Sequence, residues 1–417
     1  MTRSMRPPAL PSARAPSGVP PDDRVGERPD AMHIVFATNK LDVGGIEINL
    51  VRLTRELIEL GHEVTVVSAR GKLSGEVEAA GGVTVDVEMN LRSAPVLRRD
   101  MRAVAALLQA RPADVIQVFS ASSAVLISLV RRLARWRGRA FPPVVSAIMG
   151  LVSSSDEPPP RTYARAWATT FGADLLLTTS PAIDHMARRL PIARSRIREA
   201  LVVGVELRDP QLDESQRRRL RDELLGERGT KLVMTAGRLE ASKSHELFVA
   251  AAAEIVRREP GARMAIVGEG SLRRQLTEQI DELGLTGVVA LLGERSDLDD
   301  LLRCTDVYVR PGVVDGLIGI TVLEAQAACV PVVAFDTEDV RMGITHGVTG
   351  WLVAPGDVRG LADAVTRLLD PSDADREVVA AARRQVAERF DIAVVARSLA
   401  ALYGELPSAD GRVLSEA

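Results

Sequence analysis

Short runs of β-branched and aliphatic residues alternate with helical periodicity from residue 33 onward. The first unit is HIVFAT (33–38), a helix with apolar residues every three or four positions between residues 50 and 60, and EVTVVSA (63–69). This order predicts a βαβ unit, and repeated βαβ units form a parallel sheet. Five more strands are predicted before residue 205: VTVDV (83–87), DVIQVF (114–119), PVVSAI (143–148), LLLTTS (175–180) and IREALVVG (197–204).

The alternation breaks between residues 205 and 230, where RDPQLDESQRRRLRDELLGERG is strongly charged. We interpret this segment as a linker followed by an exposed helix. Six further strands predict a second doubly wound sheet: LVMTAG (232–237), RMAIVG (263–268), VVALLG (288–293), DVYVRP (306–311), VPVVAF (330–335) and TGWLVA (349–354). Ligands of such sheets bind outside the carboxyl ends of the strands. Two such domains facing each other would form a cleft, where we expect the chemistry.

Length and composition agree with two globular domains. The chain has 417 residues, of which 46% are hydrophobic and 26% charged, and no apolar run approaches the roughly 20 residues that span a bilayer. Residues 1–30 are rich in Pro, Arg and Ser without the apolar core of a signal peptide, so we expect a disordered leader. Two cysteines, Cys304 and Cys329, are too few for a disulfide framework, which favours a cytoplasmic location.

Charge is distributed unevenly along the chain. Residues 31–205 hold 22 Lys and Arg against 16 Asp and Glu, and residues 206–417 hold 26 against 36. The basic half suits an anionic acceptor or membrane surface, although solvated arginines are the commoner explanation of such a charge excess. The segment RRLARWRGRAF (131–141) carries five arginines beside Trp136, so it either lies on anionic lipid or is a solvated helix end. Aromatic residues make up only 3%, which argues against nucleic acid as a partner.

Two cations follow the first strand of the second half. Arg238 and Lys243 in TAGRLEASKSHELF precede a predicted helix. Fixed charge and a helix N-terminus at one strand end would form a diphosphate clamp, and a solvated loop is the alternative. Gly268 lies in VGEGS after the next strand, but the glycine pattern is incomplete for a dinucleotide fingerprint. An oxidoreductase is therefore disfavoured.

The stretch VVDGLIGITVLEAQA (313–327) follows another strand of this sheet. Gly319 allows close approach of a ligand, and the amides near Ile320 and Thr321 would begin a helix that carries Glu324. That carboxylate would accept hydrogen bonds from two adjacent ribose hydroxyls, or it is simply a solvated residue. In the first half, Gly44 and Gly45 separate the first strand from its helix, where they either admit a ligand or form a tight turn.

The chain resembles the family 4 glycosyltransferases, retaining enzymes of the GT-B fold that transfer a sugar from a nucleotide diphosphate. The resemblance covers about residues 32–405 and rests on six segments in the order typical of the family: GGIEINLVRLTRELIELGHEVTVV, AGRLEASK, IVGEGSLRRQL, LLGERSDLDDLLRCTDVYVRP, VLEAQAACVPVVA and HGVTGWLVAPGD. It implies an acceptor-side domain over residues 31–207 and a donor-binding domain over residues 208–390. Residues 391–410 would form a helix that returns to the first domain.

The resemblance also implies roles for individual residues. Arg238 and Lys243 would neutralise the donor diphosphate, and Glu324 would bind the nucleotide ribose. Asp315 would contact the hydroxyls of the transferred sugar. Glu294 and Arg295 would lie near the base. Gly44, Gly45, Gly268, Gly319, Ile320 and Thr321 would complete the donor site. No metal or other cofactor is expected, because these cations and helix amides supply the positive field.

The chain departs from the family pattern at three places. Asp315 and Glu324 are separated by eight residues instead of seven, which makes Ile318 look inserted. Gln117, Phe119 and Met149 stand where the family commonly has histidines that contact the donor sugar. Cys329 replaces a glycine, and we expect it to be buried and unreactive.

These features favour a retaining hexosyltransferase that uses a UDP- or GDP-linked sugar in polysaccharide, glycolipid or secondary-metabolite biosynthesis. A non-catalytic glycosyltransferase-like protein that binds a nucleotide sugar or a partner is the alternative, because the histidines are missing and the acidic pair is altered. Turnover distinguishes the two. The expected location is the cytoplasm, with peripheral contact at the inner membrane surface as a further expectation.

Overall fold

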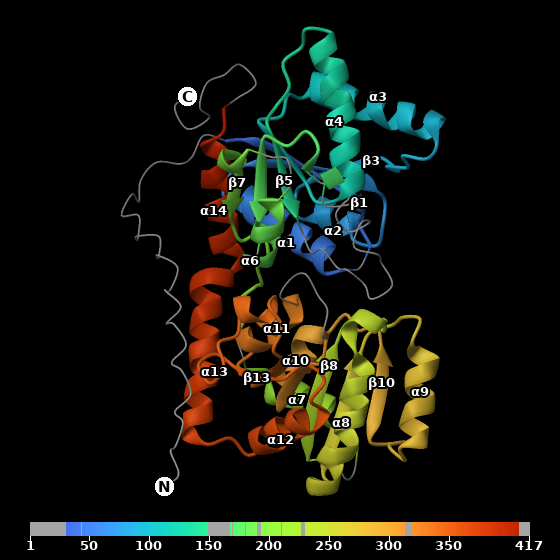
Figure 1. Ribbon diagram of the computed structural model, residues 1–417, viewed down its shortest axis with the longest axis vertical. Helices are drawn as coiled ribbons and strands as arrows, with labels where there is room; N and C mark the ends of the chain where they lie inside the picture. The colour runs from blue at the N-terminus through green and yellow to red at the C-terminus, as the bar shows by residue number, and fades with distance from the viewer. Residues whose placement is uncertain are drawn as a thin grey trace, which may run out of the picture.

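The computed structural model describes residues 31–42, 44–148, 167–168, 170–179, 181–189, 193–209, 211–226, 230–312 and 319–407. Two sheets, with parallel pairing throughout, form two domains stacked end to end (Figure 1). The first has seven strands in the order β3-β2-β1-β4-β5-β6-β7, and the second has six in the order β10-β9-β8-β11-β12-β13. The expected α/β fold with two Rossmann-like domains is confirmed. In the described part of the chain, no helix is long and apolar enough to cross a membrane.

The first sheet alternates with helices along the chain. Its strands are β1 (His33–Lys40), β2 (Glu63–Ala69), β3 (Val83–Asp86), β4 (Val115–Val118), β5 (Val144–Ile148), β6 (Leu175–Thr178) and β7 (Ile197–Glu199). The helices include α1 (Gly45–Glu59), α2 (Ser74–Ala79), α3 (Ala94–Ala110), α4 (Ala121–Trp136) and α6 (Pro181–Ala187). Leu50, Leu53 and Leu57 on α1 are fully buried, as their spacing predicts.

The second sheet follows α7 (Glu214–Leu225), which is the exposed helix predicted in the charged segment. Its strands are β8 (Lys231–Ala236), β9 (Ala262–Val267), β10 (Val289–Gly293), β11 (Val307–Arg310), β12 (Val332–Phe335) and β13 (Trp351–Val353). The helices include α8 (His245–Arg258), α9 (Arg273–Glu282), α10 (Leu298–Arg303), α11 (Ile320–Ala327), α12 (Val358–Leu368), α13 (Asp373–Gln385) and α14 (Ile392–Gly404).

Each of the thirteen predicted strands coincides with a strand of the structure. Several predicted strands extend beyond the observed ends, and the largest difference is at residues 197–204, where the strand ends at Glu199. The chain then leaves the sheet and runs beside the C-terminal segment. The Val205 N–H donates to the Phe390 carbonyl at 2.8 Å, and the Ile392 N–H donates back to the Val205 carbonyl at 3.0 Å. The two connections between the domains therefore lie side by side.

The C-terminal helix α14 returns to the first domain, as the resemblance implies. It packs against α1 and runs along the first domain, while α13 lies beside the second (Figure 1). The buried Tyr403 hydroxyl donates to the Gln117 side-chain oxygen on β4. One hydrophobic cluster includes Phe36 of the first sheet, Phe390, Tyr403 and Tyr308 of the second sheet. The core is thus continuous between the domains through the C-terminal segment.

Candidate active site

A narrow pocket lies where the strand order of the second sheet reverses. The chain leaves β8 toward β9 and β10 on one side, and β11, β12 and β13 lie on the other. Such a switch point opens a crevice at the carboxyl ends of two adjacent strands. The pocket there has a volume of about 30 Å³. Its lining residues are Thr235, Ala236, Lys243, His245, Tyr308, Arg310, Pro311, Gly312, Gly319 and Thr321. Three of the residues singled out in the sequence, Lys243, Gly319 and Thr321, therefore meet in one pocket.

A short 3-10 turn (Ala241–Lys243) positions Lys243 between β8 and α8. A Cβ placed on Gly237 would lie 3.6 Å from Lys243 Cδ, so the lysine side chain runs along bare backbone at the end of β8. Ser244 follows in the left-handed conformation, with φ at 50°, and starts α8. This turn points the chain back across the strand end and leaves Lys243 half-buried against the pocket.

Arg238 lies outside the lining of this pocket. Its guanidinium is exposed and pairs with Glu240 at 2.9 Å. Burial raises the pKa of Glu47 in the first turn of α1, and the charge of Arg238 partly offsets that shift. Arg238 is therefore close to α1 of the first domain, whereas Lys243 lines the pocket.

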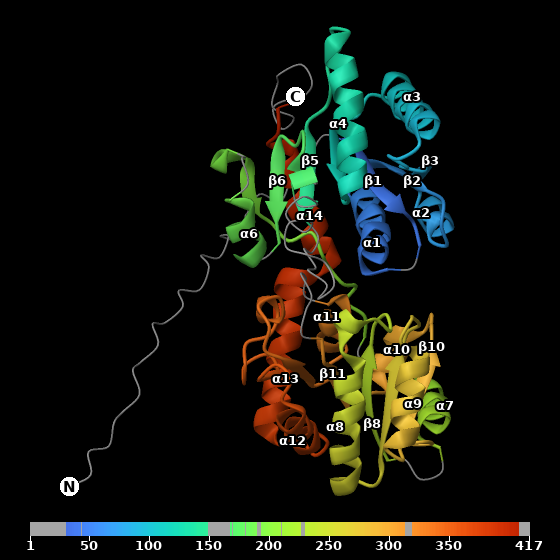
Figure 2. The ribbon, with the colours of Figure 1, turned by 45° about the vertical axis from the view of Figure 1, so that its right-hand side comes forward.

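The start of α11 forms the opposite wall of the pocket. Gly319 is the residue that precedes the helix, and its carbonyl accepts the Val322 N–H at 2.9 Å. Across the domain boundary, a Cβ on Gly45 would lie 3.4 Å from Ile320 Cδ1. Figure 2 shows α1 and α11 facing each other where the two domains meet. Gly44, Gly45, Ile320 and Thr321 thus lie around the junction of these two helices.

Glu324 occupies an ion pair instead of lying in solvent. Its Oε1 accepts a hydrogen bond from Arg52 Nη2 of α1 at 2.7 Å, and the Arg52 and Glu324 side chains are only 18% and 15% exposed. The interpretation of Glu324 as a solvated residue is therefore wrong. Because α11 faces α1, the helix that was predicted from its local sequence brings this carboxylate to a cation 272 positions earlier in the chain.

Glu294 and Arg295 point to different partners. Glu294 is exposed and accepts from Lys72 of the first domain at 3.1 Å. Arg295 makes two 2.7 Å bonds to Asp297 and a 2.6 Å bond to Glu223 on α7. These hydrogen bonds to Asp297 and Glu223 raise the pKa of Arg295. Only Glu294 of this pair lies against the first domain, while Arg295 is held by two carboxylates of its own domain.

The remaining sequence-predicted positions fall into two groups. Gly268 takes φ 138°, and a Cβ there would overlap the Gly237 carbonyl oxygen, so backbone packing alone requires this glycine. Gln117 and Phe119 belong to the core of the first domain, where Phe119 stacks edge-on against Phe36 at 5.3 Å. Three positions lie outside the described residues: Met149, Asp315 and Ile318.

Cys329 is half-buried, so the expectation of a buried thiol was wrong. It follows α11 with φ at 57°, in the left-handed conformation that usually ends a helix with glycine. This conformation holds the residue at the helix terminus, where neighbouring residues cover it only partly. Cys304, by contrast, is buried.

Sequence reasoning missed His245 and Arg310 in the pocket. Arg310 ends the buried strand β11, and a cation at the end of an apolar run was a signal that could have identified it. His245 opens α8 two residues after Lys243, but nothing in its local sequence indicates which way the ring points. Arg310 is 6% exposed and donates from Nη2 to Asp339 at 2.6 Å. His245 is 1% exposed, and burial lowers its pKa to about 4.

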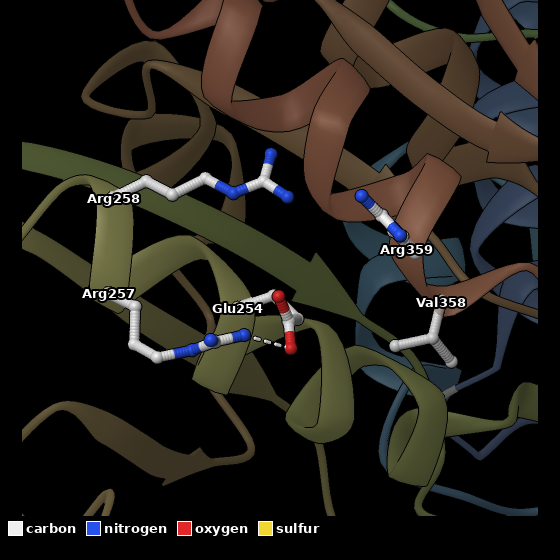
Figure 3. Close-up of a pocket in the computed structure, with 5 residues that line it drawn as sticks. All are labelled: Glu254, Arg257, Arg258, Val358 and Arg359. Atoms are coloured by element: carbon white, nitrogen blue, oxygen red, sulfur yellow. Dashed lines mark ion pairs between the residues drawn. The ribbon is translucent and has the colours of Figure 1, made fainter.

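A wider groove of about 670 Å³ lies elsewhere on the second domain (Figure 3). Its lining residues are Glu254, Arg257, Arg258, Val358 and Arg359. Arg257 pairs with Glu254, and Arg258 pairs with Asp363. Glu254 is nine residues beyond the start of α8, or about 13 Å along the helix. None of the candidate residues lines this groove, so the switch-point pocket is the better candidate site.

Two family models match the chain. The model described as Glycosyltransferase Family 4 matches residues 43–199, and the model described as Glycosyl transferases group 1 matches residues 216–385. The first match covers most of the seven-stranded domain. The second includes every described residue that lines the switch-point pocket.

Known proteins with related sequences are sugar transferases by name. The chain is 30% identical over 247 residues to the alpha-D-kanosaminyltransferase of Streptomyces kanamyceticus, which covers 58% of this chain and 63% of that enzyme. It is 27% identical over 358 residues to the D-inositol 3-phosphate glycosyltransferase of Frankia alni, which covers 79% of this chain and 86% of that enzyme. The chain thus spans a little under two thirds of the first of these relatives.

A solved structure shares the fold. The Anabaena protein HepE, in complex with UDP-glucose, matches with a TM-score of 0.78 and 19% sequence identity. The match covers 90% of this chain and 100% of HepE. The similarity therefore extends over both domains and the connection between them.

Proposed function

Because the chain belongs to the family 4 glycosyltransferases and has their GT-B fold, we propose that it transfers a hexosyl sugar from a nucleotide diphosphate to an acceptor hydroxyl. The observation that carries this proposal is the switch-point pocket. There a half-buried lysine, Lys243, faces the first amides of α11 across the ends of two adjacent strands. A lysine and helix amides at one place suit the charged oxygens of a phosphate group.

The donor is a UDP- or GDP-linked sugar in this proposal. HepE, which shares the fold, was solved with UDP-glucose. Glu324 would bind the ribose hydroxyls after releasing Arg52, and Glu294 would lie near the base after releasing Lys72. Both carboxylates lie on the second domain and face cations of the first, so a nucleotide between the domains would meet them both.

The reaction proceeds with retention of configuration at the anomeric carbon. The acceptor oxygen bonds to that carbon on the face from which the diphosphate leaves, the bond to the diphosphate oxygen breaks, and a phosphate oxygen takes the acceptor proton. The main task of the protein is then to stabilise the leaving charge, with Lys243 in the pocket and Arg238 at its rim. Asp315 is assigned to the sugar hydroxyls by resemblance, and no metal ion takes part.

A donor screen followed by turnover assays tests this function. Thermal-shift measurements with UDP-, GDP-, ADP- and dTDP-linked sugars identify the nucleotide, and hydrolysis of the bound donor shows turnover. Lys243→Ala is expected to reduce turnover about 100- to 1,000-fold, the effect of losing one preorganised donor. Lys231→Ala is the matched control, because Lys231 lies at the opposite end of β8.

Intact turnover in Lys243→Ala or in Glu324→Ala would refute the residue assignment. Binding without turnover, against a broad panel of donors and acceptors, would instead favour a non-catalytic protein that binds a nucleotide sugar. Wild-type protein that binds none of the donors would refute the proposed function itself.

The far end of α4 supports a peripheral contact with an anionic membrane. Trp136 is 83% exposed there, and four arginines around it are exposed as well: Arg132, Arg135, Arg137 and Arg139. Arg131 is excluded from this patch because it pairs with Asp174 at 2.7 Å. Vesicles containing phosphatidylglycerol should bind the protein, and phosphatidylcholine vesicles should not. Trp136→Ser should weaken this binding and Trp167→Ser, at another exposed tryptophan, should not; equal effects contradict the contact.

A further inference from the structure

Two polar side chains in the switch-point pocket are buried without a hydrogen-bond partner. Both ring nitrogens of His245 and the Thr235 hydroxyl find none among the residues that the structure describes. Each residue is only 1% exposed, and each lines the pocket. An unpaired polar group costs about 1–3 kcal/mol when buried, so groups left in this state at a pocket indicate a missing ligand.

Arg310 supplies a buried positive charge beside these groups. Its Nη2 donates to Asp339 at 2.6 Å, and its Nη1 donates to the Gly312 carbonyl at 2.9 Å. A Cβ on Gly319 would lie 3.8 Å from Arg310 Nε, so the backbone at the start of α11 passes directly over the guanidinium. Arg310 is therefore fixed in orientation at the floor of the pocket.

The charges of the pocket favour an anion over a cation. Lys243 and Arg310 are both cationic, and Asp339 is the carboxylate bound to Arg310. The Tyr308 hydroxyl contributes no negative charge, because burial raises its pKa to about 12. A volume of about 30 Å³ holds one or two atoms the size of a water oxygen, which is too little for a whole phosphate group.

We propose that a non-bridging oxygen of the donor diphosphate enters this pocket, where His245 and Arg310 bind it together with Lys243. This assignment rests on the proposed glycosyltransferase function. The imidazole acts as a neutral hydrogen-bond donor, and the two cations carry the charge. As the sugar–oxygen bond breaks, negative charge grows on the diphosphate, and the donors that stabilise it already line the pocket.

The neutral state of His245 follows from its surroundings. Burial lowers its pKa to about 4, and the nearby charge of Lys243 acts in the same direction. The backbones of Gly237 and Arg238 oppose this shift but make no hydrogen bond of good geometry with the ring. At neutral pH the ring therefore has one N–H to donate and gives up no proton to the leaving group.

Binding of inorganic pyrophosphate to the full chain tests the pocket directly. His245→Phe keeps an aromatic ring and removes the donor, so it should weaken pyrophosphate binding roughly ten- to one-hundredfold in calorimetry. His245→Asn retains an N–H and should restore part of that affinity. The matched control is His62→Phe, because His62 is also buried with a pKa lowered by burial but lies in the first domain. It should bind pyrophosphate as the wild type does.

Turnover adds a readout that a purely structural histidine would not move, and the pH dependence tests whether the ring is neutral. With a nucleotide-sugar donor, His245→Phe should lower kcat more than it raises KM, because the bond strengthens as the diphosphate leaves. Pyrophosphate affinity of His245→Phe should show the same pH dependence as the wild type between pH 6 and 8, because the ring stays neutral there.

Wild-type affinity for pyrophosphate in folded His245→Phe would overturn the inference, as would equal losses in the phenylalanine and asparagine variants. If His245→Phe does not fold, His245→Asn and Arg310→Lys replace it. Partly retained affinity in the asparagine variant with weakened binding in the lysine variant supports the site, and unchanged binding in the lysine variant overturns it. The protein could bind pyrophosphate through His245 and yet bind no nucleotide sugar. That result would refute the proposed function but support the switch-point pocket as an anion site.

Discussion

Replacing Arg52 with methionine removes the cation that pairs with Glu324, the carboxylate predicted to bind the ribose. Methionine keeps most of the aliphatic stem of arginine, so the packing of α1 changes little. The Arg52–Glu324 hydrogen bond is 2.7 Å long, and both side chains are more than four-fifths buried. A ribose that engages both carboxylate oxygens through its two hydroxyls competes with Arg52 for Oε1.

The size of the effect follows from this burial. A hydrogen bond between charged groups contributes about 1.5–3 kcal/mol, and an exposed ion pair only about 0–1 kcal/mol. For a pair that is largely but not fully buried, we take a contribution of about 1–2 kcal/mol, and a ribose that breaks the pair loses this amount of binding free energy. Arg52→Met should therefore tighten ribonucleotide binding by roughly 5- to 30-fold and lower the free energy of unfolding by about the same 1–2 kcal/mol.

Calorimetry with a nucleoside diphosphate and its 2′-deoxy analogue separates this effect from a general change in affinity. The gain should appear with the ribonucleotide and largely disappear with the deoxy compound, which cannot engage both carboxylate oxygens. Arg55→Met is the matched control, because Arg55 lies on the same helix and pairs with Glu206 at 2.7 Å. Weaker ribonucleotide binding by Arg52→Met would refute the reasoning and indicate that Arg52 orients Glu324. An equal gain with both nucleotides would also contradict it.

Three further predictions concern stability. Asn49→Ala should lower the free energy of unfolding in urea by about 2–4 kcal/mol, because the buried Asn49 amide makes hydrogen bonds of 2.6 and 2.9 Å to the backbone of Val202 and Gly204; a loss below about 1 kcal/mol would contradict this. Cys329→Gly should raise the free energy of unfolding by about 1 kcal/mol, because φ there is 57°, and an unchanged midpoint would count against it. The pKa of His245 is lowered to about 4 in the folded chain, so the unfolded chain protonates this histidine first and the free energy of unfolding falls as the pH drops from 6.5 to 4. Over this interval the free energy of unfolding of the wild type should fall by about 3 kcal/mol more than that of His245→Phe, and parallel pH profiles would refute this.

The strands and the position of the site could be predicted from local sequence. Parallel strands are buried on both faces, so a strand such as β12, with the sequence VVAF, appears as a short continuous apolar run. The carboxyl end of a strand is then known from the direction of the chain. Lys243 and Gly319 could be assigned to one edge of one sheet for that reason, and the structure places both in the same pocket.

The partners of the site residues could not be predicted in this way. Local pattern placed Glu324 one turn into a helix, but only the packing of α11 against α1 brought Arg52 to it. The same holds for Gln117, which pairs with a tyrosine 286 positions away. Such contacts depend on how two domains and the returning helix α14 are oriented, and no local periodicity encodes that orientation.

Sequence by itself thus determined the order of the strands and helices, the two parallel sheets and the edge at which chemistry is expected, because buried strands and helices require apolar residues at regular spacings. Tertiary structure alone decided that the His245 ring and the Arg310 guanidinium turn into the pocket, and that Arg295 turns away to Glu223 and Asp297. The direction of a side chain at a strand end is selected by the neighbours that the fold assembles around it, and those neighbours come from distant parts of the sequence.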